Sequence, residues 1–285
     1  MSLNFVINNL TVYNYLKGGK MMGRIRVTQL FPFLIPIRLK QRKYKFYKEM
    51  EKDDHLYSEY LHHELLEFVV FESEETMVNN NSGYDIKYQY NKVYNLKLAA
   101  KVLDKLIIAP GETFSFWKRL KEAQQEERFK NGLTLVNDKI TEAPGGGLCQ
   151  LSNILYWVFL HSPLSTVERT AHDVESFYLP DKLYGIDATV SEGWLDLKVK
   201  NNTDVSFQLD IQFTAETIKI RLMSSQNPTA SYEIFNLNNE IFYKNGQPYR
   251  KVDIGRSVKD LITNDKNNVI LYTDIVKIGY NLEGI

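Results

Sequence analysis

Apolar side chains recur at helical intervals in two parts of the chain. In segment 92–106 the positions three and four apart are Val93, Leu96, Ala99, Ala100, Leu103 and Leu106. This spacing predicts a helix with one face in the core. Residues 151–160 are apolar on nearly every side, so the helix predicted from Leu148 or Cys149 onward runs through the core. The polar stretch 118–132 is predicted as a further helix that ends at Asn131–Gly132.

Alternation of apolar and polar residues dominates the rest of the chain, in short runs bounded by turn residues. Asn245–Gly246 predicts a tight hairpin, and Pro110–Gly111 predicts a turn. The runs predicted as strands or hairpins are 107–108, 133–143, 185–190, 195–199, 206–213 paired with 218–223, 240–254 and 267–280. We therefore predict an α+β fold, with a mostly antiparallel sheet packed on the buried cysteine-bearing helix and the 92–106 helix, and a β-rich C-terminal tail.

Composition and charge narrow the range of functions. Lys plus Arg and Asp plus Glu each number 35, so no overall basic charge favours nucleic acid as a partner. A chain with one cysteine has no internal disulfide and no cysteine zinc cluster. His55, His62 and His63 lie in a segment of helical spacing without carboxylates at a metal-site interval. They are predicted as surface or packing residues, and no metal or cofactor is expected.

The N-terminal region carries no evident targeting signal. The apolar stretch 30–37 is shorter than the roughly 20 residues that span a bilayer, and no signal peptide is recognised, so a cytoplasmic location is expected. The next stretch places Leu39, Phe46, Tyr47 and Met50 on one helical face. Its basic residues are Arg38, Lys40, Arg42, Lys43, Lys45 and Lys48. Such a helix either contacts an anionic membrane surface or packs on the protein with its charges in water.

Three glycines, Gly145, Gly146 and Gly147, precede the single cysteine, Cys149, at the predicted start of the core helix. Glycine permits unusual backbone angles and close approach of another group. The unpaired N–H groups and the dipole at a helix N-terminus favour negative charge, so a thiol there is readily ionised. The same N–H groups can form an oxyanion hole.

A nucleophilic cysteine needs a base and a group that orients the base. His161 ends the same helix, roughly 18 Å from Cys149 at 1.5 Å per residue, which is too far. His172 lies in a segment that can return alongside the helix, and Asp187 lies between apolar neighbours, where a carboxylate needs a partner. We predict Cys149, His172 and Asp187 as nucleophile, base and orienting group, with Asp173 and Asp196 as weaker choices for the third role. The alternative is a buried cysteine that acts only as a small hydrophobe.

Three separated motifs resemble the VanW family. They are NLKLAAKVLDKLIIAPGETFSFW, GGGLCQLSNILYWVFLHSPLSTVERTAHDV and GIDATVSEGWLDLKVKNNTD, in that order. The resemblance implies an accessory role in glycopeptide (vancomycin) resistance, in or near peptidoglycan precursor metabolism. It implies a cell-wall precursor peptide or other resistance-cluster proteins as partners. Export, which is common among members of the family, is not carried over to this chain.

The resemblance also implies which side chains belong to the site. The family's recurring residues fall on Pro110, Gly111, Glu112, Phe114, Ser115, Phe116, Gly145 to Cys149, Gln150, Ser152, His172 and Asp187. We expect Gln150 and Ser152 to polarise a carbonyl or to hold the start of the helix. Glu112 and Ser115 join the substrate-binding group if the turn that carries them lines the same cleft.

The chain is accordingly divided into four regions. Residues 1–21 are predicted as a disordered upstream extension, with Met21 or Met22 as the natural start. Residues 22–84 form an N-terminal basic and helical region, and 85–222 form the VanW-like domain. Residues 223–285 form a small β-rich C-terminal module without cysteine or histidine, from which no chemistry is expected.

Three hypotheses of function remain open on the sequence. The first is a cysteine-dependent hydrolase or acyltransferase of peptidase type acting on cell-wall peptides. The second is a non-catalytic module that binds a precursor peptide or partner enzyme, with a carboxylate held at the helix N-terminus. The third is a membrane-surface scaffold that uses the basic helix.

Overall fold

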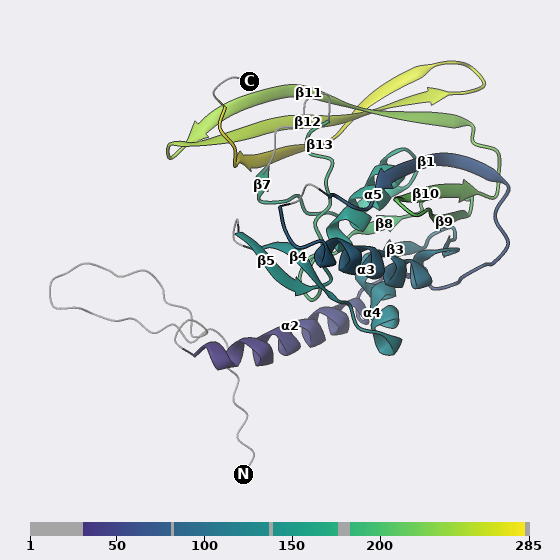
Figure 1. Cartoon of the computed structure of the whole chain (residues 1–285). Helices are drawn as coiled ribbons and strands as arrows, with labels where there is room; N and C mark the ends of the chain where they lie inside the picture. The colour runs from purple at the N-terminus through teal and green to yellow at the C-terminus, as the bar shows by residue number, and fades with distance from the viewer. Residues whose placement is uncertain (1–30, 81–82, 137–138, 176–182, 283–285) are drawn as a thin grey trace, which may run out of the picture. The chain divides into compact units, whose positions relative to one another are not determined.

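A computed structural model describes residues 31–80, 83–136, 139–175 and 183–282 (Figure 1). The chain divides into two units, residues 1–53 and 54–285, and each is described by itself. The predicted extension at 1–21, with the alternative starts Met21 and Met22, lies outside the described residues.

The described part of the first unit is mainly one helix. A short 3-10 turn, Pro32–Leu34, leads into α2, Ile35–Met50. A proline, Pro36, lies in the first turn of α2, where its missing N–H would have no helical partner. The helix expected for the basic segment is therefore present. No helix among the described residues is both long enough and apolar enough to cross a membrane.

An antiparallel sheet with strand order β1–β10–β9–β2, called the central sheet below, lies beside α5 in the second unit (Figure 1). On β10, Ile218, Ile220 and Leu222 alternate and are fully buried, as period-2 patterning requires of a core-facing strand. The predicted pairing of 206–213 with 218–223 is confirmed by the register of β9 and β10. The strands of this sheet are β1, Phe68–Thr76; β2, Ile107–Ile108; β9, Phe207–Phe213; and β10, Thr217–Ser224.

A second four-stranded sheet, of order β11–β12–β13–β7, contains most of the C-terminal tail. The β11–β12 hairpin turns at Asn245 and Gly246, which have φ of 52° and 74°. Positive φ at both turn residues is what a two-residue hairpin of this twist needs, so the predicted hairpin is confirmed. The strands are β7, Val174–Glu175; β11, Ala230–Lys244; β12, Gln247–Asp260; and β13, Lys266–Ile278.

Two smaller sheets complete the β structure, one of order β3–β8–β6 and one made by the β4–β5 hairpin. The hairpin expected within 133–143 is present, whereas the strand expected over 195–199 is limited to Lys198–Lys200. The strands are β3, Thr113–Ser115; β4, Asn131–Val136; β5, Lys139–Pro144; β6, Ser165–Glu168; and β8, Lys198–Lys200. Nearly all pairings are antiparallel, and the predicted α+β fold class is confirmed.

The helices of the second unit are α3, Lys87–Leu103; α4, Phe116–Glu126; and α5, Leu148–Leu160. Helix α5 packs against α3 and against β1 and β10 of the central sheet, which places the cysteine-bearing helix in the core as predicted. The α3 helix ends before the predicted residue 106, because Lys105 has φ 66° and its N–H donates to the Leu209 carbonyl of β9. Helix α4 ends at Glu126, and Asn131 already belongs to β4.

Two sequence expectations are wrong. Residues 54–67 form no helix; instead the Ser58 N–H donates to the Thr113 carbonyl at 3.0 Å and the His62 N–H donates to the Lys105 carbonyl at 2.9 Å. These bonds to neighbouring segments replace the bonds of a helix. Residues 186–190 belong to no strand. Their segment is held by side chains of α5, by Arg169 and by the Thr170 carbonyl.

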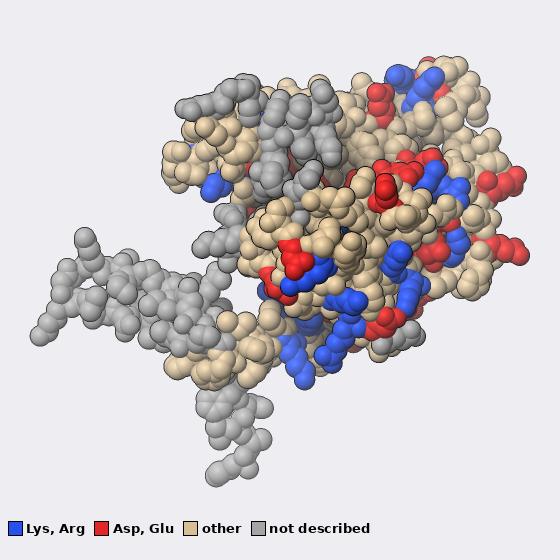
Figure 2. Space-filling model, in the orientation of Figure 1, with Lys and Arg blue, Asp and Glu red and all other residues tan. Residues whose placement is uncertain are grey.

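Acidic and basic side chains both occur on the face of the molecule drawn in Figure 2. Some form exposed ion pairs, such as Lys219 with Glu72 at 2.8 Å, and pairs of this kind contribute little stability. Buried charges are fewer and more informative. Asp210, 1 % exposed, accepts from both Lys105 and Arg221, and the candidate site contains a second such cluster.

Candidate functional site

The three glycines before α5 have different structural roles. Gly145 and Gly147 have φ of 87° and 99°, in the left-handed region that side chains other than glycine seldom adopt. Gly146 instead permits close packing, since a Cβ there would lie 2.5 Å from Cα of Gly132. The turn therefore requires glycine at all three positions. Gly147 is the N-cap of α5, and Cys149 is the second helical residue.

A buried asparagine on α3 holds this turn in place. The Asn95 Nδ2 group donates to the carbonyls of Lys130 at 2.9 Å and Gly146 at 3.0 Å, and its Oδ1 accepts from the Lys130 N–H at 2.8 Å. Asn95 is fully buried and joins Gly146 to Lys130, whose carbonyl also accepts from the Gly145 N–H at 3.1 Å. Sequence reasoning missed it, although an asparagine within the apolar stripe of a helix is the kind of exception that needs such partners.

The thiol of Cys149 faces the segment 186–190. Its Sγ lies 3.6 Å from Oγ1 of Thr189 and 3.7 Å from the carbonyl oxygen of Val190. Within the described residues, the backbone N–H of Cys149 makes no hydrogen bond, whereas those of Leu148 and Gln150 bond to the glycine turn. A donor is thus left unpaired beside the thiol, at the positive end of the helix dipole.

Two polar residues of α5 anchor the segment that faces the thiol. Ser152 Oγ donates to the Ala188 carbonyl at 2.5 Å, and Asn153 Oδ1 accepts from the Ala188 N–H at 2.7 Å. Both backbone groups of Ala188 are therefore bonded to the helix that carries Cys149. This arrangement fixes the distance between Cys149 and Asp187, which precedes Ala188. Ser152, predicted as a site residue, thus lies at the site in a positioning role.

Asp187 binds His172 twice. Its Oδ2 accepts from the His172 backbone N–H at 2.7 Å and forms a short hydrogen bond with Nδ1 of the same residue. The carboxylate thereby orients the imidazole and leaves Nε2 as the ring nitrogen available to a neighbour. Asp173, the adjacent acid, is exposed, so Asp187 is the carboxylate that orients His172.

The three side chains are coupled electrostatically. Burial raises the pKa of the Cys149 thiol, but hydrogen bonding with His172, Val190 and Thr189 outweighs burial and brings the pKa below its ordinary value. Hydrogen bonding to Asp187, and then to Cys149, raises the pKa of His172 to about 10. Burial also raises the pKa of Asp187, yet hydrogen bonds from His172 and the charge of Arg169 lower it overall. Both shifts act in the direction of a thiolate beside an imidazolium.

Arg169 supports this cluster from behind. Its guanidinium donates to Oδ1 of Asp187 at 3.0 Å, to the carbonyls of Asp187 and Gly185 at 2.5 and 2.8 Å, and to Oδ1 of Asp274 at 3.1 Å. Only 9 % of the Arg169 side chain is exposed. Two carboxylates therefore share one buried cation, which holds Asp187 in its ionised form.

The C-terminal sheet contributes to the same cluster. Asp274 and Tyr272 lie on β13, and the Tyr272 hydroxyl donates to the Gly185 carbonyl at 2.9 Å. Sequence reasoning missed both residues. A signal was present for Asp274, because it shares the alternating face of β13 with Val276 and Ile278, which are buried. No local signal marked Arg169, which lies outside any regular element.

The remaining predicted residues lie elsewhere or have other partners. Gln150 donates from Nε2 to the Thr76 carbonyl of β1 at 2.9 Å, so its amide tethers the helix to the sheet. Glu112 accepts from the Ala109 N–H within its own turn. Ser115 is the N-cap of α4 and donates to Asp196 at 2.6 Å. The structure records no contact from Glu112 or Ser115 to Cys149, His172 or Asp187 among the described residues.

Two further candidates are now placed. Asp196 is fully buried and accepts from Ser115, from the Trp117 N–H and from the Leu197 N–H, so it caps α4 rather than orienting His172. His161 stacks on Phe71 with ring centroids 3.9 Å apart and lies at the far end of α5. Within the described residues, no three His, Cys, Asp or Glu side chains are grouped as metal ligands would be.

The fold and site define an α+β protein in which a buried helix begins, after a glycine turn, at a cysteine that faces a histidine–aspartate pair. The family described as "VanW like protein" matches residues 91–223, which include every residue of this cluster except the β13 contacts. No solved structure matches the chain.

Two curated proteins are similar to the chain. It is 43% identical over 264 residues to the vancomycin B-type resistance protein VanW of Enterococcus faecalis, covering 92% of this chain and 96% of that protein. It is 32% identical over 111 residues to the uncharacterized protein YoaR of Bacillus subtilis, covering 39% of this chain and 36% of that protein. The chain therefore belongs to the VanW family.

Proposed function

We propose that the protein acts in vancomycin resistance, at or near the peptidoglycan precursor, as a cysteine-dependent acyl-transfer or peptidase-type enzyme. The resistance role is supported by the similarity to a relative named as a vancomycin B-type resistance protein, which extends over nearly the whole of both chains. The chemistry is supported by one observation above all. The Cys149 thiol has a lowered pKa and His172 a raised pKa in a cluster that Asp187 orients.

In the proposed reaction the Cys149 thiolate attacks the carbonyl carbon of an amide or ester in the substrate. The tetrahedral oxyanion accepts a hydrogen bond from the unpaired Cys149 N–H at the start of α5. As the carbon–nitrogen or carbon–oxygen bond breaks, the His172 imidazolium gives its proton to the leaving amine or alcohol. Water or an acceptor amine, deprotonated by His172, then attacks the thioester and releases the acyl group and the free thiol.

A second candidate role rests on α2. This helix carries the six basic residues already named, and exposed apolar side chains occur at its N-terminal end, with Ile37 54 % exposed and Phe33, in the turn before it, 71 % exposed. Exposed apolar and basic side chains on one helix favour contact with an anionic membrane surface. Membrane contact of this kind is compatible with the catalytic proposal.

The test of the catalytic proposal is the pH dependence of Cys149 alkylation by iodoacetamide. In the unaltered protein we expect a midpoint below the free-thiol value of about 8.5. In His172→Ala the midpoint should rise above that value, because burial then acts on the thiol without the imidazole. His63→Ala, at an exposed histidine, is the control and should behave as the unaltered protein.

Slow alkylation whose pH dependence is the same in His172→Ala would show that the cluster is not an active site. The protein would then be a module that binds a precursor peptide or partner enzyme. If the thiol responds as expected, acyl-enzyme formation is sought by mass spectrometry with peptides ending in D-alanyl-D-alanine or D-alanyl-D-lactate. Cys149→Ser is the blank for that measurement.

A further inference from the structure

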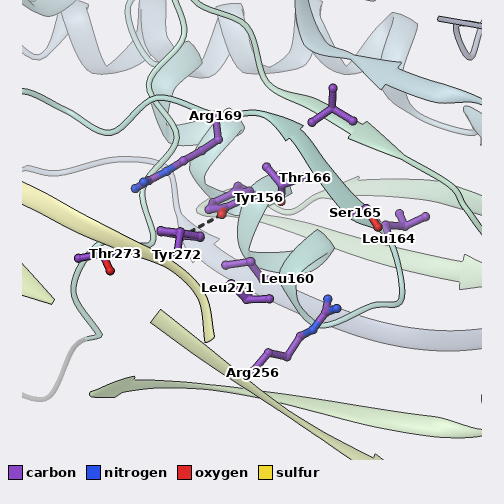
Figure 3. A pocket seen from close by; sticks show the side chains of 11 residues that line it. Tyr156, Leu160, Leu164, Ser165, Thr166, Arg169, Arg256, Leu271, Tyr272 and Thr273 are labelled. Carbon is purple, nitrogen blue, oxygen red and sulfur yellow. Dashed lines mark hydrogen bonds between the residues drawn. The ribbon is translucent and has the colours of Figure 1, made fainter. Parts of the chain in front are cut away.

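A cavity of about 530 Å³ lies behind the candidate site, between α5 and the C-terminal sheet (Figure 3). Its lining includes Tyr156 and Leu160 from α5 and Tyr272 from β13. Tyr156 is seven residues beyond Cys149, or about 10 Å along a helix, so this cavity is separate from the space in front of the thiol. Its volume is in the range of pockets that hold small molecules.

The chemistry of the lining favours an anionic ligand. Two guanidinium groups, Arg169 and Arg256, contribute to the wall together with hydroxyl groups, and the described lining contains no Asp or Glu. In Figure 3, Arg256 reaches from β12 toward the end of α5, and Arg169 lies beyond the hydrogen-bonded pair of Tyr156 and Tyr272. Leucine side chains between them provide apolar surface.

The two arginines differ in whether an acidic side chain pairs with them. Arg169 is paired with Asp187 and Asp274. Arg256 takes part in no ion pair within the described part of the chain; it donates from Nη1 to the Ser162 carbonyl at 2.8 Å, and its Nε is buried without a partner. Arg256 is half-buried, with its guanidinium carbon 5.2 Å from the centroid of the Tyr232 ring, and a partly desolvated cation without a counter-charge is costly. Because Nε is enclosed by protein, a ligand in the cavity reaches the guanidinium at Nη2, for which no hydrogen bond to a described residue is recorded.

We propose that this cavity is a binding site for a small carboxylate-bearing ligand of about dipeptide size, anchored by Arg256. The leucines and tyrosines contact the apolar part of the ligand, and its carboxylate supplies the counter-charge that Arg256 lacks. Arg169 forms part of the cavity wall and also binds Asp187. Through Arg169, the part of the cavity wall away from Arg256 is connected to the carboxylate that orients His172.

Binding is tested by ligand-observed NMR titration with N-acetyl-alanyl-alanine, with its C-terminal amide as the uncharged probe of the same size. Cys149→Ser, which cannot carry out the proposed chemistry, is titrated beside the unaltered protein, so binding is scored independently of catalysis. The carboxylate form should bind at least about tenfold more tightly than the amide, as a charge-assisted hydrogen bond to Arg256 provides. Arg256→Gln should remove that preference.

Two further variants make the result specific. Lys259→Gln removes a positive charge from the same strand outside the cavity and should leave binding unchanged. Arg256→Lys keeps the positive charge but loses the planar guanidinium, so it should bind the carboxylate with intermediate affinity. It provides a second test of the site if Arg256→Gln does not fold. Equal binding of acid and amide, or full affinity in Arg256→Gln, overturns the proposal. If inorganic phosphate binds more tightly than the dipeptide, and Arg256→Gln abolishes phosphate binding, the assignment of a carboxylate ligand is overturned.

Discussion

Replacing Arg169 by methionine tests the buried network behind the candidate site. The change removes four hydrogen bonds and leaves Asp187 and Asp274, 30 % and 10 % exposed, without their shared cation. Breaking a buried ion pair by removing one partner costs about 3–5 kcal/mol. Because Asp187 is partly exposed and keeps its bonds to His172, we expect the lower end, about 3 kcal/mol.

The loss of stability in Arg169→Met should depend on pH, and the direction of that dependence follows from the pKa of Asp274. Burial raises the pKa of Asp274 even with Arg169 present, so the folded protein binds this proton more tightly than the unfolded chain. The free energy of unfolding therefore falls as pH rises through the unfolded value of about 3.9. Without Arg169 the pKa of Asp274 rises further, and the deficit relative to the unaltered protein should be smaller at pH 5 than at pH 7.5.

Urea unfolding followed by circular dichroism at the two pH values measures both effects. A loss of about 3 kcal/mol corresponds to a fall in Tm of about 6–12 °C for a unit of this size. The double variant Arg169→Met/Asp274→Asn should recover at least about 1 kcal/mol, because one unpaired carboxylate is gone. A cost below about 1 kcal/mol, or the same cost at both pH values, would refute the assignment of Arg169 as the shared counter-ion.

Two further predictions concern the glycine turn and the buried acid at α4. Gly146→Ala places a Cβ 2.5 Å from the Gly132 backbone and should lower the free energy of unfolding by about 1–3 kcal/mol. In Gly132→Ala the nearest atom lies 3.0 Å from the new Cβ, so the loss of stability should be smaller. A lower Tm in Gly132→Ala than in Gly146→Ala would contradict this packing. Burial raises the pKa of Asp196 to about 6, so the free energy of unfolding should fall as pH rises from about 4 to 6. Asp196→Asn should reduce that slope, leaving the contribution of Asp274, without changing Cys149 alkylation, and an unchanged slope would place its origin in another group.

Much of the site follows from local sequence. The glycines, Cys149 and the apolar helix behind it form one continuous pattern, and backbone geometry at a helix start depends on nearby residues. The choice of histidine could be narrowed, because the distance along α5 excludes His161 as the base for Cys149. Asp187 was identified from its apolar neighbours, although the strand expected around it is absent. The backbone of this segment bonds to Arg169, to side chains of α5 and to the Thr170 carbonyl instead of to another strand.

Longer-range features were beyond the reach of the sequence. Segment 54–67 has helical spacing, yet its N–H groups bond to residues about 45–55 positions away, and pattern alone does not report such partners. Glu112 and Ser115 were expected at the site because recurring residues of the family fall on these positions. They lie in separate hydrogen-bonded turns, one closed on Ala109 and one on Asp196.

The sequence by itself determined the α+β class, the buried helix, the glycine turn that begins it and the three residues of the candidate cluster, because each is encoded by spacing or by residues close along the chain. Only the tertiary structure decided which groups make that cluster electrostatically stable. Asp274 and Tyr272 reach it from a strand about 100 residues beyond Arg169. Charges and hydrogen bonds act through space, and their energy depends on burial and distance that only the assembled fold defines.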